Sequence, residues 1–349
     1  MDGAALMRVE AVVFREFGGP EVLEVEPVDI SEPEAGQTLV RVLAVSVNHL
    51  DLEIRAGVSR MPIRLPHVLG REVVGEVIKV GDESSSWRPG DRVVVLPHVP
   101  CGSCRHCLTG SANICLNGWM PGIHAWGGNA EVMLAPTRGL VAAPDLDPVE
   151  IAALPIGFGT AWRALHHTAH VVSGEWVVVA GASGGLGHAC LQVAALAGAR
   201  PIALVRDPAK ADFVKMCGAE EVVLTTDAGW PDRVREITNG RGAEVIIDHV
   251  GGANFVGSVK ALADRGRLVV AGGHGGEFPP LDLIDVFRRE LRVLGVRSQR
   301  PDDVAIALEM AARGSIQAHV AEVLPLAETR AAHELIDTRT ITGKVVLRP

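Results

Sequence analysis

The feature that most constrains the fold is a glycine-rich loop near the middle of the chain. The apolar residues 176–180 (WVVVA) lead into Gly181-Ala-Ser-Gly184-Gly185-Leu-Gly187, and the uncharged segment 188–198 (HACLQVAALAG) follows at helix length. A strand, a glycine turn and a helix in this order bring free backbone N–H groups and the helix dipole together, which suits a pyrophosphate. The loop therefore predicts a dinucleotide site contacted by Gly181, Ser183, Gly184, Gly185, Leu186 and Gly187.

Strand-like and helix-like segments alternate from about residue 157 onward. Helical patterns such as 254–264 (NFVGSVKALAD) separate the apolar runs. Six strands with intervening helices predict a doubly wound parallel sheet in an α/β fold. Backbone must approach a bound nucleotide closely where such strands end. The residues expected there are Val250, Gly251, Gly272 and Gly273, and the strand-like runs after the loop are 201–205 (PIALV), 221–225 (EVVLT), 244–250 (EVIIDHV), 267–272 (RLVVAG) and 291–296 (LRVLGV).

The end of the second strand indicates which nucleotide is bound. In NAD-preferring folds a carboxylate at this point binds the ribose 2′-hydroxyl, but here the sequence reads LVRDPAK. Arg206 stands about where the acid is expected, and with Lys210 it can bind a 2′-phosphate. Asp207 comes one residue late and suits a helix N-cap. We expect NADPH to be preferred over NADH, the alternative being that Arg206 is a solvated surface charge.

The first 150 residues have a different pattern. Short β-like runs such as 38–47 (TLVRVLAVSV) and 72–80 (EVVGEVIKV) are separated by turns rich in Gly, Pro and Asp. Many short strands punctuated in this way predict a barrel or sandwich. The tail from about residue 300 holds a helix and the strand-like end 344–349 (KVVLRP), which we expect to return to this first domain.

Four of the six cysteines lie in one short loop. Cys101, Cys104, Cys107 and Cys115 have the spacing C-x2-C-x2-C-x7-C. Four thiolates in one loop can close the tetrahedral coordination sphere of Zn²⁺, which leaves no position for substrate and predicts a structural zinc. Redox thiols and an iron–sulfur cluster are the alternatives, but a β domain without an export signal favours zinc.

Composition excludes several classes of protein. A net charge of −9 argues against binding to nucleic acid through overall basic charge. Residues 176–199 carry no charge, but their glycine-rich break favours a buried strand and helix over a membrane span. The N-terminal segment lacks a secretory pattern, so a cytoplasmic location is expected. The chain has no tyrosine, which removes the tyrosine general acid of one large class of hydride-transfer enzymes.

Together the β-rich first part, the cysteine loop CGSCRHC…C, the loop GASGGLG and the returning tail resemble the medium-chain dehydrogenase/reductase superfamily. This group includes zinc alcohol dehydrogenases and quinone oxidoreductases. The resemblance covers essentially the whole chain. It implies a GroES-like β-barrel catalytic domain over residues 1–156, completed by 300–349, and a Rossmann domain over 157–299. It also implies an active site in the cleft between the domains, a nicotinamide contact at Thr160, and homodimers or homotetramers.

The chain departs from the alcohol dehydrogenase pattern at its catalytic zinc. That pattern has Cys-His-x-Asp where this sequence reads Asn48-His49-Leu50-Asp51, and Gly-His-Glu where it reads Gly70-Arg71-Glu72. Ile156 stands where the third ligand, a cysteine, would align. Because Arg71 also opposes a cation electrostatically, we expect one structural zinc per chain and no catalytic zinc.

The segment NHLDLEIRAG instead resembles the N-x-x-D…R-x-G stretch of the zinc-independent quinone oxidoreductases. Four residues are therefore the candidate catalytic groups: Asn48, His49, Asp51 and Arg71. Asn48 could donate to an enolate oxygen, Asp51 could orient His49 or an arginine, and His49 could act as an acid. Alternatively, these residues cap local turns. Arg71 either grips a substrate carbonyl or carboxylate or pairs with Glu72 or Asp51.

The resemblance and these departures favour an NADPH-dependent reductase of a small molecule with an activated C=C bond, or of a quinone, without catalytic zinc. The leading alternative is a carbonyl reductase or alcohol dehydrogenase acting on C=O. A second alternative is a protein that binds the cofactor without turnover. Weaker candidates for the pocket flank the cysteine loop, namely His98, Trp119, His124 and Trp126.

Overall fold

A computed structural model describes residues 6–82 and 84–349 of the chain. The chain forms two compact units. The first takes in the residues up to Ile156 together with Gln299–Pro349, and the second is Gly157–Ser298. No helix in the described part of the chain is long and apolar enough to cross a membrane.

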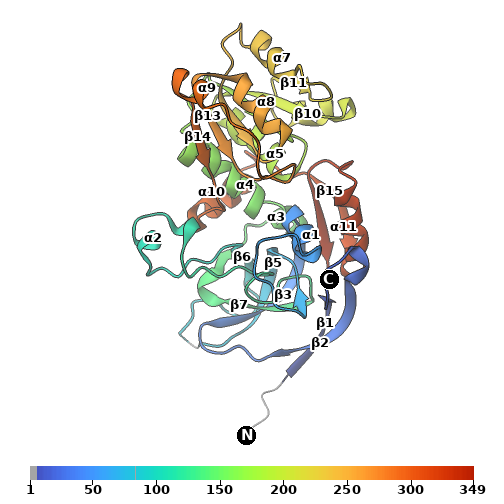
Figure 1. Cartoon of the computed structure of the whole chain (residues 1–349). Helices are drawn as coiled ribbons and strands as arrows, with labels where there is room; N and C mark the ends of the chain where they lie inside the picture. The colour runs from blue at the N-terminus through green and yellow to red at the C-terminus, as the bar shows by residue number, and fades with distance from the viewer. Residues whose placement is uncertain (1–5, 83) are drawn as a thin grey trace. The chain divides into compact units, whose positions relative to one another are not determined.

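The first unit is built on β-sheets (Figure 1). A three-stranded sheet has the order β2-β1-β4, and a seven-stranded sheet has the order β15-β16-β3-β5-β6-β8 with β7 also paired to β3. Its helices are α1 (His49–Arg55), α2 (Arg105–Leu108), α3 (Pro148–Ala152), α10 (Pro301–Ala312) and α11 (Thr329–Asp337). Its strands are β1 (Leu6–Phe14), β2 (Glu24–Ser31), β3 (Gln37–Val47), β4 (His67–Val68), β5 (Glu72–Val80), β6 (Arg92–Val95), β7 (Val132–Pro136), β8 (Leu140–Ala142), β15 (Val320–Pro325) and β16 (Lys344–Arg348).

The C-terminal strand β16 lies inside the larger sheet, between β15 and β3. Val345 pairs with Val47 and Leu347 with Val45 in antiparallel register, and all four side chains are buried. The tail therefore contributes to the core of the first unit. This pairing also brings Lys344, the first residue of β16, close to the start of β5.

The second unit is a six-stranded parallel sheet in the order β11-β10-β9-β12-β13-β14. The order reverses between β9 and β12, as in a doubly wound Rossmann sheet, and the predicted fold class is confirmed. Helices pack beside the strands (Figure 1). The elements are β9 (Trp176–Val179), α5 (Gly185–Leu196), β10 (Arg200–Val205), α6 (Ala211–Met216), β11 (Glu221–Leu224), α7 (Trp230–Ile237), β12 (Ala243–Asp248), α8 (Ala253–Ala261), β13 (Leu262–Val270), α9 (Leu283–Arg288) and β14 (Arg292–Gly295). Helix α4 (Pro155–Trp162) contains the boundary between the units, and a π-helical segment, Arg163–Ala169, follows it.

Burial of the central strands follows from their sequence. Val177, Val178 and Val179 of β9 have no exposed surface, and Ile246 and Ile247 of the neighbouring β12 have none either. A parallel sheet covered on both faces requires such continuous apolar runs, whereas a half-exposed strand alternates. The uncharged segment 176–199 is thus a buried strand, a loop and a helix, as the sequence predicts.

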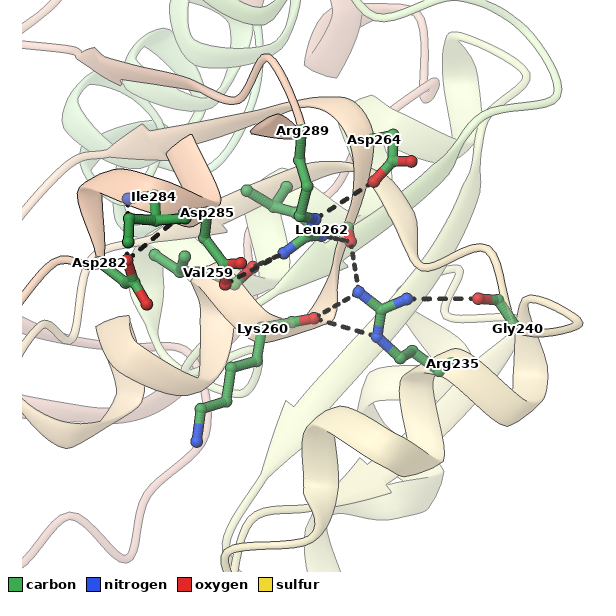
Figure 2. Close-up of polar contacts among 10 residues, drawn as sticks. All are labelled: Arg235, Gly240, Val259, Lys260, Leu262, Asp264, Asp282, Ile284, Asp285 and Arg289. Carbon is green, nitrogen blue, oxygen red and sulfur yellow. Dashed lines mark hydrogen bonds and ion pairs between the residues drawn. The ribbon is translucent and has the colours of Figure 1, made fainter. Parts of the chain in front are cut away.

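One element boundary differs from the sequence prediction. The helical pattern runs through residue 264, but α8 ends at Ala261 and β13 begins at the next residue. Two arginines bind the carbonyl groups at this junction (Figure 2). Arg235 donates to the carbonyl oxygens of Lys260, at 2.8 Å, and Leu262, at 3.0 Å. Arg289 also donates to Leu262 O and to Val259 O. These side chains satisfy carbonyls that a longer helix would have satisfied internally.

Arg235→Ala is expected to lower the free energy of unfolding by about 1–3 kcal/mol, because carbonyls at the helix end lose charged donors. Arg233→Ala on the same helix is the matched control. Arg233 is exposed and pairs only with Glu236 in the described structure, so its loss should cost less than about 0.5 kcal/mol. Urea unfolding measures both values. Equal costs would contradict the role assigned to Arg235.

Candidate active site and nucleotide loop

The first unit contains a buried polar network centred on Glu72, which has no exposed surface. One carboxylate oxygen accepts from Lys344 Nζ at 2.6 Å and from Asn48 Nδ2 at 3.0 Å. The other accepts from the backbone N–H of Ile156 at 2.5 Å. A buried charge is tolerated when it is paired and hydrogen-bonded in this way. Glu72 therefore links the start of β5 to β16, to the residue before α1, and to the start of α4.

Asn48 uses its whole side-chain amide within this network. Nδ2 donates to Glu72 and, at 3.3 Å, to Ser46 O, while Oδ1 accepts from Lys344 Nζ at 2.7 Å. An amide NH₂ has two donors, and both are engaged. Asn48 thus links Glu72, Ser46 and Lys344, and its predicted donation to a substrate oxygen stays a prediction.

Asp51 lies on the first turn of α1 and is buried. Its Oδ2 accepts from the backbone N–H of Asn48 at 2.8 Å. This is a local capping contact, as in the alternative that these residues cap turns. In the described structure Asp51 forms no hydrogen bond with His49 or Arg71, and its Oδ1 is buried without a partner. Burial raises the pKa of Asp51 to about 6, against the lowering effects of the Asn48 N–H, Arg71 and Lys344.

Arg71 is 8% exposed and lies beside the network. Nη2 contacts the carbonyl oxygen of Pro97 at 3.4 Å and Met120 Sδ at 3.6 Å, both long contacts. Nε is buried and makes no hydrogen bond to any described residue. Lys344, and not Arg71, is the ion-pair partner of Glu72. The charges of Asp51 and Glu72 nevertheless act on Arg71, so its contact with substrate and its pairing with Glu72 or Asp51 both stay predictions.

Two histidines lie on the loops and helix nearby. His124 Nδ1 accepts from the backbone N–H of Met120 at 3.1 Å, and burial followed by the charge of Arg71 lowers the pKa of His124. His49 is the first residue of α1, with its side chain one-third exposed and Nε2 at 4.0 Å from Glu53. The role of His49 as an acid stays a prediction.

The resemblance places three metal ligands at positions 48, 71 and 156, and all three residues lie next to Glu72 in space or in the chain. Asn48 and Ile156 both donate to its carboxylate, and Arg71 is its neighbour in the chain. An amide, an apolar side chain and a guanidinium occupy these positions. None of them is the thiolate or imidazole that zinc selects, and the cation opposes a metal.

The four cysteine sulfurs of the loop 101–115 lie within 4.8 Å of one another. Sγ of Cys104 is 3.5 Å from Cys107 and 3.7 Å from Cys115, and Cys101 is 3.9 Å from Cys107. Tetrahedral zinc with Zn–S bonds of about 2.3 Å sets its sulfurs about 3.8 Å apart. A disulfide needs about 2.05 Å. The four residues therefore fit a closed zinc site.

The glycine loop of the second unit follows β9 and opens α5. Gly181 has φ +59°, and a Cβ at Gly187 would lie 2.3 Å from Gly181 O, so both positions require glycine. Gly184 is the N-cap, and the N–H groups of Gly185, Leu186 and Gly187 begin the helix. Ser183 precedes them. N–H groups in a first helical turn have no partner within the helix, and they suit a pyrophosphate.

Two cations follow the next strand, β10. Arg206 is exposed, and Asp207 caps the following turn by accepting from Ala209 N at 2.9 Å, as predicted. Burial lowers the pKa of Lys210, Asp207 raises it, and the charge of Arg206 lowers it further. A bound anion would offset this effect of one positive charge on the other.

The other predicted nucleotide residues follow β12 and β13. A Cβ placed on Gly181 would lie 3.2 Å from Val250 Cγ2, and one on Gly251 would lie 3.0 Å from Gly273 Cα. The residues Gly181, Val250, Gly251, Gly272 and Gly273 thus gather at the carboxyl ends of adjacent strands. Thr160 lies in α4 and is 8% exposed.

Comparisons with known proteins agree with this architecture. Residues 34–145 match the alcohol dehydrogenase GroES-like domain, and residues 185–313 match the zinc-binding dehydrogenase family. The NAD-dependent alcohol dehydrogenase of Sulfolobus acidocaldarius is 31% identical over 97% of this chain and 99% of its own. The human quinone oxidoreductase is 32% identical over 99% and 98%. The crystal structure of an NAD-dependent alcohol dehydrogenase superposes with a TM-score of 0.93, at 38% identity over 97% and 99%.

The chain therefore belongs to the medium-chain dehydrogenase/reductase superfamily. It is an NAD(P)-dependent oxidoreductase with a GroES-like and a Rossmann part.

Sequence analysis missed the residues that organise the polar network. The sequence presents Glu72 only as the neighbour and a possible partner of Arg71, and Lys344 only as the first residue of the last strand. Lys344 comes directly before the apolar run VVL of the last strand. Because this strand enters the core, the charge of the lysine needs an anionic partner, and this pattern could have predicted one. The Ile156 N–H carries no signal in the side-chain sequence.

Asp51→Asn tests the buried carboxyl. Because the folded-state pKa of about 6 exceeds the ordinary 3.8, wild-type stability falls as pH rises between these values and is level above them. Asn keeps the oxygen that accepts from Asn48 but does not ionise. Relative to wild type, the variant should gain about 1 kcal/mol between pH 5 and pH 8. Urea unfolding at both pH values measures the gain, and an equal difference at both would refute the buried ionisation.

Proposed function

We propose that this enzyme uses NADPH to reduce an activated C=C bond, as in an enone, enal or enoyl thioester, or to reduce a quinone, without a catalytic zinc. The strongest support for this proposal comes from the surroundings of Arg71. It is a buried guanidinium with an unpartnered Nε and only long contacts at Nη2, and it stands where the resemblance expects a metal ligand.

Arg71 supplies the positive charge that the reaction needs. A bound NADPH would supply a hydride. Its addition at the β-carbon of an enal or enone would move negative charge onto the carbonyl oxygen, and the resulting enolate would take a proton from water at its α-carbon. A guanidinium that already sits in a buried, largely water-free position stabilises this oxygen without reorganising. Burial lowers the pKa of Arg71, and the charges of Asp51 and Glu72 oppose this lowering.

The alcohol dehydrogenases among the relatives support C=O chemistry as the second candidate. In that case Arg71 would polarise the carbonyl and a nearby group would give a proton to its oxygen. His49 is the candidate for this, since it is partly exposed and lies on the first turn of α1.

A simple α,β-unsaturated aldehyde mixed with the protein and NADPH distinguishes these chemistries. We expect the saturated aldehyde as the product, identified by gas chromatography. An allylic alcohol would instead establish carbonyl reduction and overturn C=C reduction for this substrate. Cofactor binding without oxidation of NADPH across a broad panel of enals, enones and quinones would support a protein that binds without turnover.

The preference for NADPH rests on Arg206 and Lys210. The two cations lie near each other after β10, where a carboxylate would stand in an NAD-preferring fold. A 2′-phosphate would relieve their repulsion and accept charge-assisted hydrogen bonds from both.

The double substitution Arg206→Ser with Lys210→Ala should weaken NADPH binding by about 10- to 100-fold and leave NADH binding nearly unchanged. Lys215→Ala, an exposed lysine of α6, is the control and should bind both as wild type does. Isothermal titration calorimetry gives the affinities. An equal loss for both nucleotides, or equal catalytic efficiency of the wild type with NADH and NADPH, would contradict the preference.

We further propose one structural zinc per chain at Cys101, Cys104, Cys107 and Cys115. Its support is the spacing of the four sulfurs, which matches a tetrahedral thiolate site. Four protein ligands leave no open position, so such a zinc would stabilise the loop and take no part in the reaction.

Elemental analysis should find one zinc per chain in the wild type and none in Cys107→Ala. The variant should also unfold at a lower temperature, because the zinc binding energy contributes to folding. Ser103→Ala in the same loop is the control and should retain the metal. Two zinc ions per wild-type chain would overturn the absence of a catalytic zinc.

We also propose that the enzyme is a homodimer or homotetramer. The strand β14 stands at one edge of the parallel sheet, with Val293 of that strand 42% exposed. An edge strand offers a row of N–H and C=O groups to a second copy.

A further inference from the structure

His249 occupies the point in the parallel sheet where the strand order reverses. β9 and β12 are neighbours in space, with Val245 paired to Val177 and Ile247 to Val179. The glycine loop follows β9, and His249 is the first residue after β12. Ligands of open α/β sheets bind outside the carboxyl ends of the strands at such a switch point. His249 is therefore beside the nucleotide loop on topological grounds alone.

The contacts of His249 agree with this placement. A Cβ on Gly181 would lie 3.0 Å from His249 Nε2, so the edge of the ring faces the glycine turn. The backbone beyond the ring is held by Asp248, whose Oδ1 accepts from Val250 N at 2.8 Å and from Gly251 N at 2.9 Å. Oδ2 of the same carboxylate accepts from Ser258 Oγ at 3.1 Å. The ring thus stands on a fixed loop.

The two ring nitrogens differ in surroundings. Nδ1 is closed off from solvent and makes no hydrogen bond to any residue that the structure describes, whereas Nε2 faces the glycine turn. Burial lowers the pKa of His249 to about 4, with His274 lowering it and Asp248 raising it, so the ring is neutral at pH 7. Buried N–H groups without partners are rarer than buried acceptors without partners. The single ring proton therefore belongs on Nε2, which makes that atom a donor toward the glycine loop.

The strand order also indicates which half of the nucleotide His249 faces. Arg206 follows β10 on one side of β9, and His249 follows β12 on the other. If Arg206 binds the adenosine 2′-phosphate, the nucleotide runs across β9 toward β12. We propose that His249 is a positioning residue that donates from Nε2 to the pyrophosphate or ribose oxygens of the nicotinamide half of NADPH. This inference rests on the proposed use of NADPH.

Three variants test which nitrogen acts. His249→Leu removes both ring nitrogens. His249→Asn places an amide near the position of Nδ1, and His249→Gln places an amide near the position of Nε2. Isothermal titration calorimetry is run on the full chain with NADPH and with 2′,5′-ADP, which lacks the nicotinamide half. We expect His249→Leu and His249→Asn to weaken NADPH binding by about 5- to 10-fold, His249→Gln to restore most of it, and 2′,5′-ADP binding to stay constant.

Other outcomes overturn the proposal. Unchanged NADPH affinity in His249→Leu would show that the ring makes no contact. An equal loss for NADPH and 2′,5′-ADP would show a general effect on the loop, and rescue by Asn in place of Gln would assign the contact to Nδ1. Wild-type protein that binds neither ligand would instead refute the proposed use of NADPH, so the two failures are distinguishable.

Discussion

The first unit depends on one buried carboxylate. Glu72 accepts from Lys344, Asn48 and the N–H of Ile156, and these groups come from the C-terminal strand, the residue before α1 and the start of α4. Removing one partner of a buried ion pair commonly costs about 3–5 kcal/mol, because the other charge stays buried. A single side chain therefore holds together three segments that are far apart in the sequence.

The same pairing bears on the role that we propose for Arg71. Lys344 neutralises Glu72 at 2.6 Å, so the adjacent guanidinium keeps only long contacts to Pro97 and Met120. Asp51 balances part of its charge through space, and burial holds the pKa of that carboxyl near 6. The result is a buried cation with an unengaged Nε donor, at the position where the resemblance expects a metal ligand.

The sequence predicts the architecture well because its signals are local. The strand–glycine–helix unit at 176–198, the apolar runs that follow it and the four clustered cysteines each carry their meaning within about twenty residues. The C-terminal strand could also be placed from its pattern. The end of α8 could not, because Arg235 of α7 and Arg289, the residue after α9, bind carbonyl groups at the junction of α8 and β13.

The polar network could not be predicted from the sequence either, because its members come from distant parts of the chain. Glu72 and Lys344 are 272 residues apart, and the third group is a backbone N–H that no side chain reveals. Asn48 was predicted as a donor to substrate, but only the fold shows that both of its donors are already engaged. Likewise, the placement of His249 at the glycine loop follows from the strand order and from no motif in the chain.

The central claim is that the guanidinium of Arg71 acts on the substrate oxygen, and chemical rescue tests it most directly. Arg71→Ala leaves a space beside Pro97 and Met120 that a small cation can enter. Its rate of enal reduction with NADPH should be far below that of wild type and should rise in a saturable manner when guanidinium ion is added at concentrations that do not unfold the protein. Methylammonium should rescue it less, because it lacks the planar fork of donors. A variant that keeps the wild-type rate, or a folded variant that binds NADPH and gains nothing from guanidinium, would contradict the account.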